Sequence, residues 1–180
     1  MACDQDYLAL DDRALLRQCD VHAYKASGPG GQRRNKVATA VRVVHIPTGL
    51  KAHADESRYQ VENKRRAIAR VRMNIACRLR RPLKMDPLEI PPMVAECISA
   101  PRKGTTGADR RLAVGRKDRR FWPVAAFLLD LLAACRAKVS SASASLGITT
   151  ANFVAVLKTD RHLLAAAQAI RKENDLRPLR

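Results

Sequence analysis

Three consecutive residues in the first fifth of the chain combine a free backbone with a neutral polar side chain: Gly30, Gly31 and Gln32. Two successive glycines let the backbone adopt positive φ and approach a substrate closely. A backbone N–H presented from such a loop can stabilise a developing oxyanion. Gln is uncharged at every pH, so it can orient a water molecule but supplies no nucleophile. This group suits the hydrolysis of a labile ester, which needs a positioned water and oxyanion stabilisation more than a strong base.

A Gly-Gly-Gln tripeptide alone is equally compatible with a tight hairpin loop. The preceding Ser27-Gly28-Pro29 brings three of the eight glycines within four positions, which predicts a loop. The segment lacks the Gly-Lys-Ser/Thr ending of a phosphate-binding P-loop. His45 and His53 are alternative general bases, but a strand histidine beside a turn is more often structural. No Ser–His–Asp or Cys–His arrangement is readable.

The residues around the loop form a longer pattern. Tyr24 to Gln32 is followed by Asn35-Lys36, by Thr39-Ala40-Val41-Arg42, and by His45 to Gly49; later come Glu56 to Gln60, Asn63-Lys64 and Ala67. This series, from about Asp20 to Leu79, resembles the catalytic domain of class-I peptide chain release factors. The resemblance implies that the loop enters the ribosomal peptidyl transferase centre and that peptidyl-tRNA ester is hydrolysed without cofactor or metal. It also implies catalytic roles for Gly30, Gly31 and Gln32, and supporting roles for Ser27, Gly28, Pro29 and Asn35.

One departure from the family follows the loop directly. The family has His-Val after the Gln, whereas this chain has Arg33-Arg34. Two added positive charges favour contacts with ribosomal RNA. They leave open whether catalysis is weakened, so a ribosome- or tRNA-binding factor with weak catalysis is the alternative function.

The charge balance points to a polyanionic partner. The chain has 34 Lys and Arg against 17 Asp and Glu, a net charge of +17. Nucleic acid is the first candidate and an anionic membrane surface the second. The candidate RNA-binding residues are Arg33, Arg34, Lys36, Arg42, Arg58, Arg102, Lys103, Arg110, Arg111, Arg116, Lys117, Arg119 and Arg120.

Compartment signals are consistent with the cytoplasm. The N-terminus lacks the apolar stretch of a secretory signal. The longest apolar run, 124–135, contains Asp130 and is too short to span a bilayer. Five cysteines with no CxxC pair predict reduced thiols, and the four histidines show no metal-ligand spacing.

Hydrophobic periodicity predicts an α+β fold for the first part of the chain. We expect a helix over 8–18, strands over 20–26, 38–46 and 50–54, and a turn at 47–49. A long helix should begin at Asp55 or Ser57 and end near Leu79. Its predicted apolar stripe is Val61, Ile68, Val71, Ile75 and Leu79.

Three regions are expected: a Gly-Gly-Gln catalytic domain at 1–81, a Pro-rich and basic linker or arm at 82–120, and an all-α module at 121–180. Five of the nine prolines fall between 82 and 101, and one helical stretch is expected over 109–119. In the module, helices are expected over 124–135, 140–146, 151–157 and 160–173. Thr149 or Thr150 should cap the third helix, and Thr159 or Asp160 the fourth.

The chain shows no tripeptide that resembles a codon reader and no room for a codon-reading domain. It is therefore similar to the short, codon-independent factors that rescue stalled ribosomes, and the basic stretch resembles their tail that enters the mRNA channel. The expected partners of a monomeric factor are large-subunit RNA and peptidyl-tRNA, with no membrane. The Leu146 to Thr150 turn also suits a helix-turn-helix regulator, the last-ranked alternative. The trigger, the role of the module and any methylation of Gln32 are left open.

Overall fold

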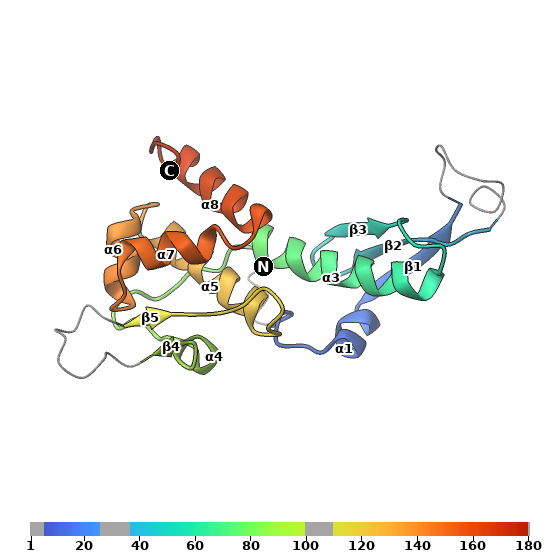
Figure 1. Ribbon diagram of the computed structural model, residues 1–180, viewed down its shortest axis with the longest axis horizontal. Helices are drawn as coiled ribbons and strands as arrows, with labels where there is room; N and C mark the ends of the chain where they lie inside the picture. Colours follow the sequence, from blue (N-terminus) through green and yellow to red (C-terminus); the bar gives the residue numbers. More distant parts are fainter. Residues whose placement is uncertain (1–5, 26–36, 100–109, 180) are drawn as a thin grey trace. The chain divides into compact units, whose positions relative to one another are not determined.

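The computed structural model describes residues 6–25, 37–99 and 110–179. The chain divides into two compact units, Met1–Ala76 (unit 1) and Cys77–Arg180 (unit 2). Unit 1 holds a small three-stranded sheet and unit 2 is mainly helical, so the predicted α+β class is confirmed (Figure 1).

The sheet of unit 1 is antiparallel and has the strand order β1-β2-β3. Its strands are β1 (Cys19–Tyr24), β2 (Ala40–His45) and β3 (Lys51–Ala54). The hairpin predicted between the second and third strands is confirmed by the pairing of Val43 with Ala52. Gly49 has φ +67° in the connecting turn, a conformation that glycine adopts without strain.

The long helix α3 (Gln60–Arg78) covers the sheet. Its buried residues include Ala67, Val71 and Ile75, spaced four apart and therefore on one face. The sheet contributes Val41 and Val43, which are 1% and 0% exposed. Arg70 and Asn74 donate to the backbone carbonyls of the third strand, which fixes the helix across the sheet.

Two expectations for this helix were wrong. It begins at Gln60, later than Asp55 or Ser57, because Ser57 is held in a separate turn by Asn63 and Glu62. Val61 is 80% exposed, although it was expected in the buried stripe. Val61 has the right angular position but lies in the first turn, where the described part of unit 1 does not cover it.

The N-terminal segment packs against the same helix. Helix α1 (Asp12–Arg17) begins after Asp11, whose carboxylate accepts from the Ala14 N–H at 2.6 Å. Arg72 of α3 donates to the Leu8 carbonyl oxygen at 3.0 Å and pairs with Asp12 at 2.9 Å. The helix predicted from residue 8 therefore starts four residues later, at its capping carboxylate.

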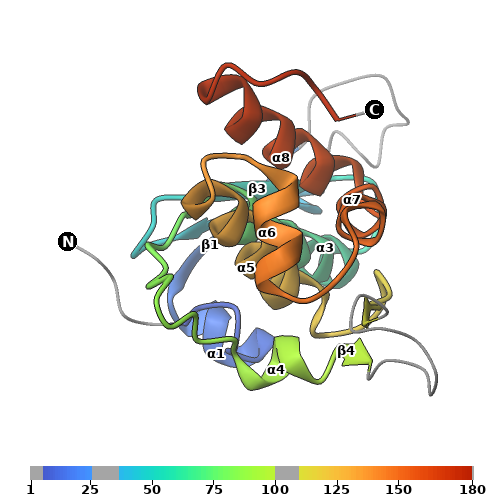
Figure 2. The ribbon, with the colours of Figure 1, turned by 90° about the vertical axis from the view of Figure 1, so that its left-hand side faces the viewer.

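Unit 2 is built around α5 (Phe121–Ala134), which is buried on most of its surface. The helices that follow are α6 (Val139–Ser145), α7 (Thr150–Leu157) and α8 (Arg161–Glu173) (Figure 2). The four predicted C-terminal helices are thus confirmed. So are two predicted caps, because Thr149 accepts from the N–H of Asn152 and Asp160 accepts from the N–H of His162.

The described part of the 82–120 stretch folds onto unit 2. It forms α4 (Pro92–Ala95), β4 (Ile98–Ser99) and β5 (Arg111–Leu112), and the two strands pair antiparallel. Val94, Cys97 and Leu112 belong to the core of unit 2. The helix expected over 109–119 is wrong: in place of a helix, the Arg111–Leu112 backbone pairs with Ile98 and Ser99. Whether the three expected regions behave as separate domains stays a prediction.

Unit 2 contains a buried carboxylate and three free thiols. Asp130 is 5% exposed and lies 3.1 Å from Arg80; its burial raises its pKa to about 6, although the guanidinium opposes that rise. Cys77, Cys97 and Cys135 are free thiols, as is Cys19 of unit 1, and burial raises the pKa of all four. Among the described residues, no helix has the length and apolar character needed to cross a bilayer.

Candidate functional site at the base of the loop

The two strands that flank the Gly-Gly-Gln loop are fixed directly against each other. Tyr24, the last residue of β1, pairs with Ala40, the first residue of β2, and the antiparallel register continues to Cys19 and His45. The loop therefore connects two adjacent strands, and both of its attachment points lie at the same end of the sheet (Figure 1). Several predicted site residues lie outside the described residues: Ser27, Gly28, Pro29, Gly30, Gly31, Gln32, Arg33, Arg34, Asn35 and Lys36.

Asn63 is the principal anchor at the base of the loop. It is 0% exposed, and its amide nitrogen donates to the carbonyl oxygens of Thr39 and Ser57, both at 2.8 Å. Its amide oxygen accepts from the Ser57 N–H at 2.9 Å. One side chain of the helix thus fixes the residue just before β2 and the turn before α3. The base of the loop is rigidly positioned even though the loop itself is Gly-rich.

Aromatic and cationic side chains pair beside this base. The Arg42 guanidinium lies 5.4 Å from the centre of the Tyr24 ring, and that of Arg58 lies 4.9 Å from the Tyr59 ring. Cation–π contacts of this kind stabilise exposed sites by about 0.5–1 kcal/mol. Both arginines were predicted RNA contacts, and both are exposed near the base of the loop.

The segment between β3 and α3 is held by ion pairs. Arg70 binds Glu56 in a short hydrogen bond, and it also donates to the His53 carbonyl oxygen at 2.6 Å. This double contact ties the segment to the middle of the helix. Nearby Tyr59 and Val61 are 53% and 80% exposed, so this end of unit 1 presents apolar as well as cationic groups.

His45 has a structural role. It is 0% exposed, with Nδ1 2.7 Å from the Thr48 hydroxyl oxygen and Nε2 3.3 Å from the Gln18 amide oxygen, and Tyr7 packs edge-on against its ring. Burial lowers its pKa, which favours the neutral ring. His45 is at the far end of β2 from the loop, about 17 Å along the strand. A general-base role at the loop is therefore disfavoured.

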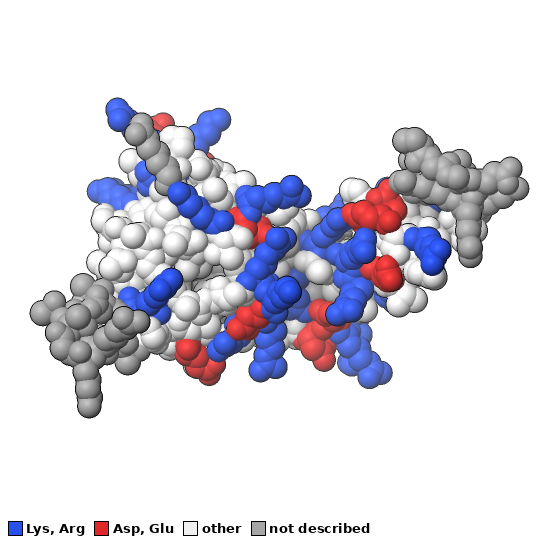
Figure 3. Space-filling view, viewed as in Figure 1, with Lys and Arg blue, Asp and Glu red and all other residues white. Residues whose placement is uncertain are grey.

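The remaining predicted RNA contacts belong to unit 2, and two of them, Arg102 and Lys103, lie outside the described residues. Arg116 pairs with the buried carboxylate of Asp160 at 3.0 Å. Arg120 pairs with Asp118 at 2.7 Å, a hydrogen bond that holds the pKa of Asp118 at about 2. Within the described residues, no carboxylate lies at ion-pair distance from Arg110, Arg111, Lys117 or Arg119. The two units share an excess of Lys and Arg over Asp and Glu (Figure 3).

Comparison with known proteins agrees with this geometry. The family model of the RF-1 domain matches residues 16–87, which include the sheet, the loop and α3. The chain carries an RF-1 domain. Peptide chain release factor 1 of Streptococcus thermophilus and that of Streptococcus pyogenes are each 54% identical to it over 56 residues, which is 31% of this chain. The alignment covers 16% of those relatives, so the chain matches about one sixth of their length. The predicted resemblance to class-I release factors is confirmed for this domain.

Two asparagines have positioning roles that the residue pattern did not reveal. Asn63 of the RF-1 domain is spaced four residues from Ala67 and eight from Val71, so it is a polar residue within an apolar stripe. That spacing is a signal that a buried amide satisfies backbone groups. Asn152 of unit 2 likewise satisfies both backbone groups of Leu112.

No cluster of three metal-ligating side chains occurs in the part of the chain that the structure describes.

Proposed function

We propose that this chain hydrolyses the ester of peptidyl-tRNA on the ribosome and releases the nascent peptide. The observation that supports this most directly is Gly30-Gly31-Gln32 between the paired strands of an RF-1 domain. A backbone N–H of the loop would stabilise the tetrahedral oxyanion, and Gln32 would orient the attacking water. The water oxygen bonds to the ester carbon, and the 3′ oxygen of the tRNA leaves with a proton.

We further propose that release is independent of the codon and that the factor acts on stalled ribosomes in the cytoplasm as a monomer. The support is that these 180 residues contain no codon-reader-like tripeptide and that the basic stretch after the RF-1 domain resembles the tail of short rescue factors. The expected contacts are large-subunit RNA and peptidyl-tRNA near the loop. Exposed Arg110, Arg111, Lys117 and Arg119 are candidates for contacts with RNA, including the mRNA channel.

A peptide-release assay tests the proposal. Ribosomes carrying labelled peptidyl-tRNA are prepared with mRNA that ends in the P site, with mRNA that continues past it, and with a stop codon in the empty site. We expect release on the first complex without a stop codon. Release only on the stop-codon complex would overturn codon independence while leaving the esterase proposal intact.

The matched variant is Gly31→Ala. We propose that the loop uses a positive φ at Gly31, so a Cβ there should reduce release by orders of magnitude while ribosome co-sedimentation persists. The alternative function, a ribosome-binding factor with weak catalysis, is favoured by Arg33-Arg34 in place of His-Val. Wild-type protein that binds ribosomes but releases no peptide on any complex would establish that alternative.

A further inference from the structure

Helices α6 and α7 of unit 2 form a helix-turn-helix. Four residues join them, and Gly147 has φ +63° in the turn. The first helix contributes the small buried residues Ala142 and Ser143, and the second contributes Phe153, which is 0% exposed. In Figure 2, α7 is seen nearly end-on beside an upright α6, so the helices cross steeply. This is the arrangement by which many proteins present a second helix to a nucleic-acid duplex.

Strand β5 is fixed beside the second helix. Asn152 accepts from the Leu112 N–H at 2.8 Å and donates to the Leu112 carbonyl oxygen at 3.0 Å. Arg110 forms a parallel bridge with Ile148 of the turn. A Cβ placed on Gly147 would lie 3.6 Å from Cδ of Arg110, so this arginine side chain lies over the turn. A cationic strand end is thereby held next to α7.

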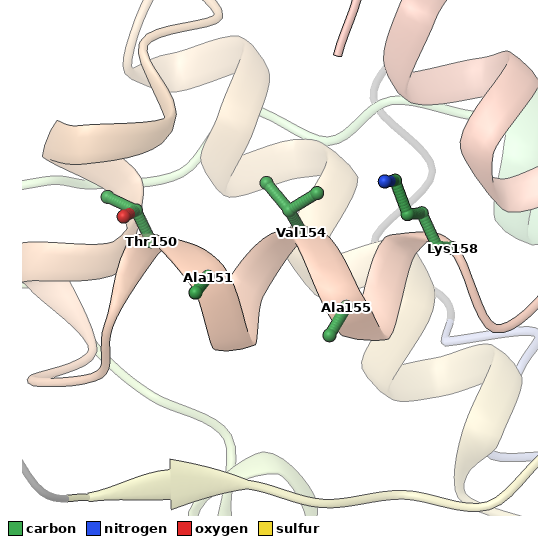
Figure 4. Close-up of a pocket in the computed structure, with 5 residues that line it drawn as sticks. All are labelled: Thr150, Ala151, Val154, Ala155 and Lys158. Carbon is green, nitrogen blue, oxygen red and sulfur yellow. The ribbon is translucent and has the colours of Figure 1, made fainter. Parts of the chain in front are cut away.

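A shallow, open groove runs along the surface of α7. It is lined by Thr150, Ala151, Val154, Ala155 and Lys158 (Figure 4). None of these carries a negative charge, and residues 131–159 contain no Asp or Glu at all. Unit 2 holds 20 of the 34 Lys and Arg but 9 of the 17 Asp and Glu. Thr150, Ala151, Ala155 and Lys158 are exposed, so the groove is accessible to a polyanion. The small side chains of Ala151 and Ala155 let a phosphate backbone approach the helix closely.

We propose that α6, α7 and the adjoining Arg110 bind a nucleic-acid duplex through its phosphate backbone, without preference for base sequence. The positive charges of Arg110 and Lys158, with no acidic residue lining the groove between them, favour phosphate groups as the ligand. The lack of sequence preference follows from the side chains of α7. The exposed face of α7 carries Thr150, Ala151 and Ala155 beside half-buried Val154, and no Arg or Gln that could pair bidentately with a base edge. The amide of Asn152 is engaged by the backbone of Leu112. This site is independent of the esterase chemistry of the RF-1 domain.

The test measures binding of the full-length chain to fluorescent duplexes of RNA and of DNA, and to a single strand, by anisotropy over a range of salt concentrations. The variant is Ala155→Glu with Lys158→Glu. The control is Ala165→Glu with Lys172→Glu, which places the same changes at exposed positions of α8. Lys172 lies in the last turn of its helix, so the control also matches the effect of charge reversal at a helix C-terminus.

We expect the α7 variant to weaken duplex binding at least about tenfold and to reduce the salt slope by about 1, whereas the control remains within about twofold of wild type. Stronger binding to RNA or to DNA duplex identifies the source of the phosphates, and either supports the proposal. Equal losses in variant and control, a preference for the single strand, or no duplex binding would overturn the proposal.

If the α7 variant loses helicity by circular dichroism, Arg110→Gln with Lys158→Gln replaces that variant, since neutralising two exposed side chains spares the core. In that pair, unchanged duplex affinity and salt slope would overturn the proposal.

Discussion

Asn63 shows how a single side chain can position the base of the Gly-Gly-Gln loop without belonging to the loop. Its amide satisfies three backbone groups, two of them in the turn at Ser57 and one at Thr39. We expect Asn63→Ala to lower the free energy of unfolding by about 2–3 kcal/mol, because buried hydrogen bonds are lost without replacement. Urea unfolding followed by circular dichroism measures this.

The matched control is Asn74→Ala on the same helix. Asn74 donates a single, exposed hydrogen bond to the Lys51 carbonyl oxygen, so its loss should lower the free energy of unfolding by less than about 1 kcal/mol. Equal destabilisation by the two variants would refute a special role for Asn63.

His45 makes stability depend on pH. Burial lowers its pKa below the ordinary value of 6.5, so the unfolded chain binds the proton more readily than the folded one. The contribution of His45 is fully present above pH 6.5 and is lost as the pH falls toward the folded-state pKa. We expect wild type to lose more unfolding free energy between about pH 7.5 and 5 than His45→Gln does, by at most about 1.4 kcal/mol per pH unit. Parallel profiles of the two proteins would contradict this.

Some residue roles could be predicted from sequence and others could not. Thr149 and Asp160 were among the predicted caps because capping needs only a short polar side chain before a helical pattern. The exposure of Val61 could not be predicted, since angular position does not reveal where the sheet beneath a helix ends. The catalytic assignment of Gly30, Gly31 and Gln32 stays a prediction from the residue pattern and the resemblance.

Strand β5 is attached to α7 through the amide of Asn152 as well as through the core packing of Leu112. Asn152 exchanges two hydrogen bonds with Leu112, across forty residues of sequence. We expect Asn152→Ala to lower the free energy of unfolding of unit 2 by about 1–2 kcal/mol and to accelerate hydrogen exchange at the Leu112 N–H. Asn174→Ala, which removes a contact within the end of α8, should leave that amide protected. Unchanged exchange at Leu112 in Asn152→Ala would mean that packing alone holds the hairpin.

At the scale of elements, local patterns predicted the hairpin of unit 1 and the four C-terminal helices, because each has its own periodicity and turn residues. The same reasoning failed for 109–119. There the Arg111–Leu112 backbone pairs with β4, a partner on the other side of residues 100–109, and Leu112 enters a core formed by later helices. A two-residue strand has no periodicity to detect, so only tertiary contacts could reveal it.

At the scale of the molecule, the core of unit 2 extends to residues that precede its four main helices. Val94, Cys97 and Leu112 are at most 5% exposed in that core, and Arg80 pairs with Asp130. We expect a fragment of residues 79–180 to unfold cooperatively when followed by Trp122 fluorescence. A fragment of residues 121–180 should have a lower midpoint, because it exposes the surface that those three residues cover. Equal midpoints would show that the helical module of 121–180 is autonomous.

The buried and partly buried thiols have a practical consequence for labelling this protein. Thiol-reactive dyes attack thiolates, and burial raises the pKa of Cys77 to about 11 and shifts those of Cys19, Cys97 and Cys135 in the same direction. At neutral pH these four cysteines should react slowly with a maleimide. Cys3→Ser together with Ala165→Cys would then give one fast-reacting position on an exposed helix face. Single-molecule fluorescence could then test whether the singly labelled protein arrives at and leaves ribosomes as proposed, with these four cysteines unaltered.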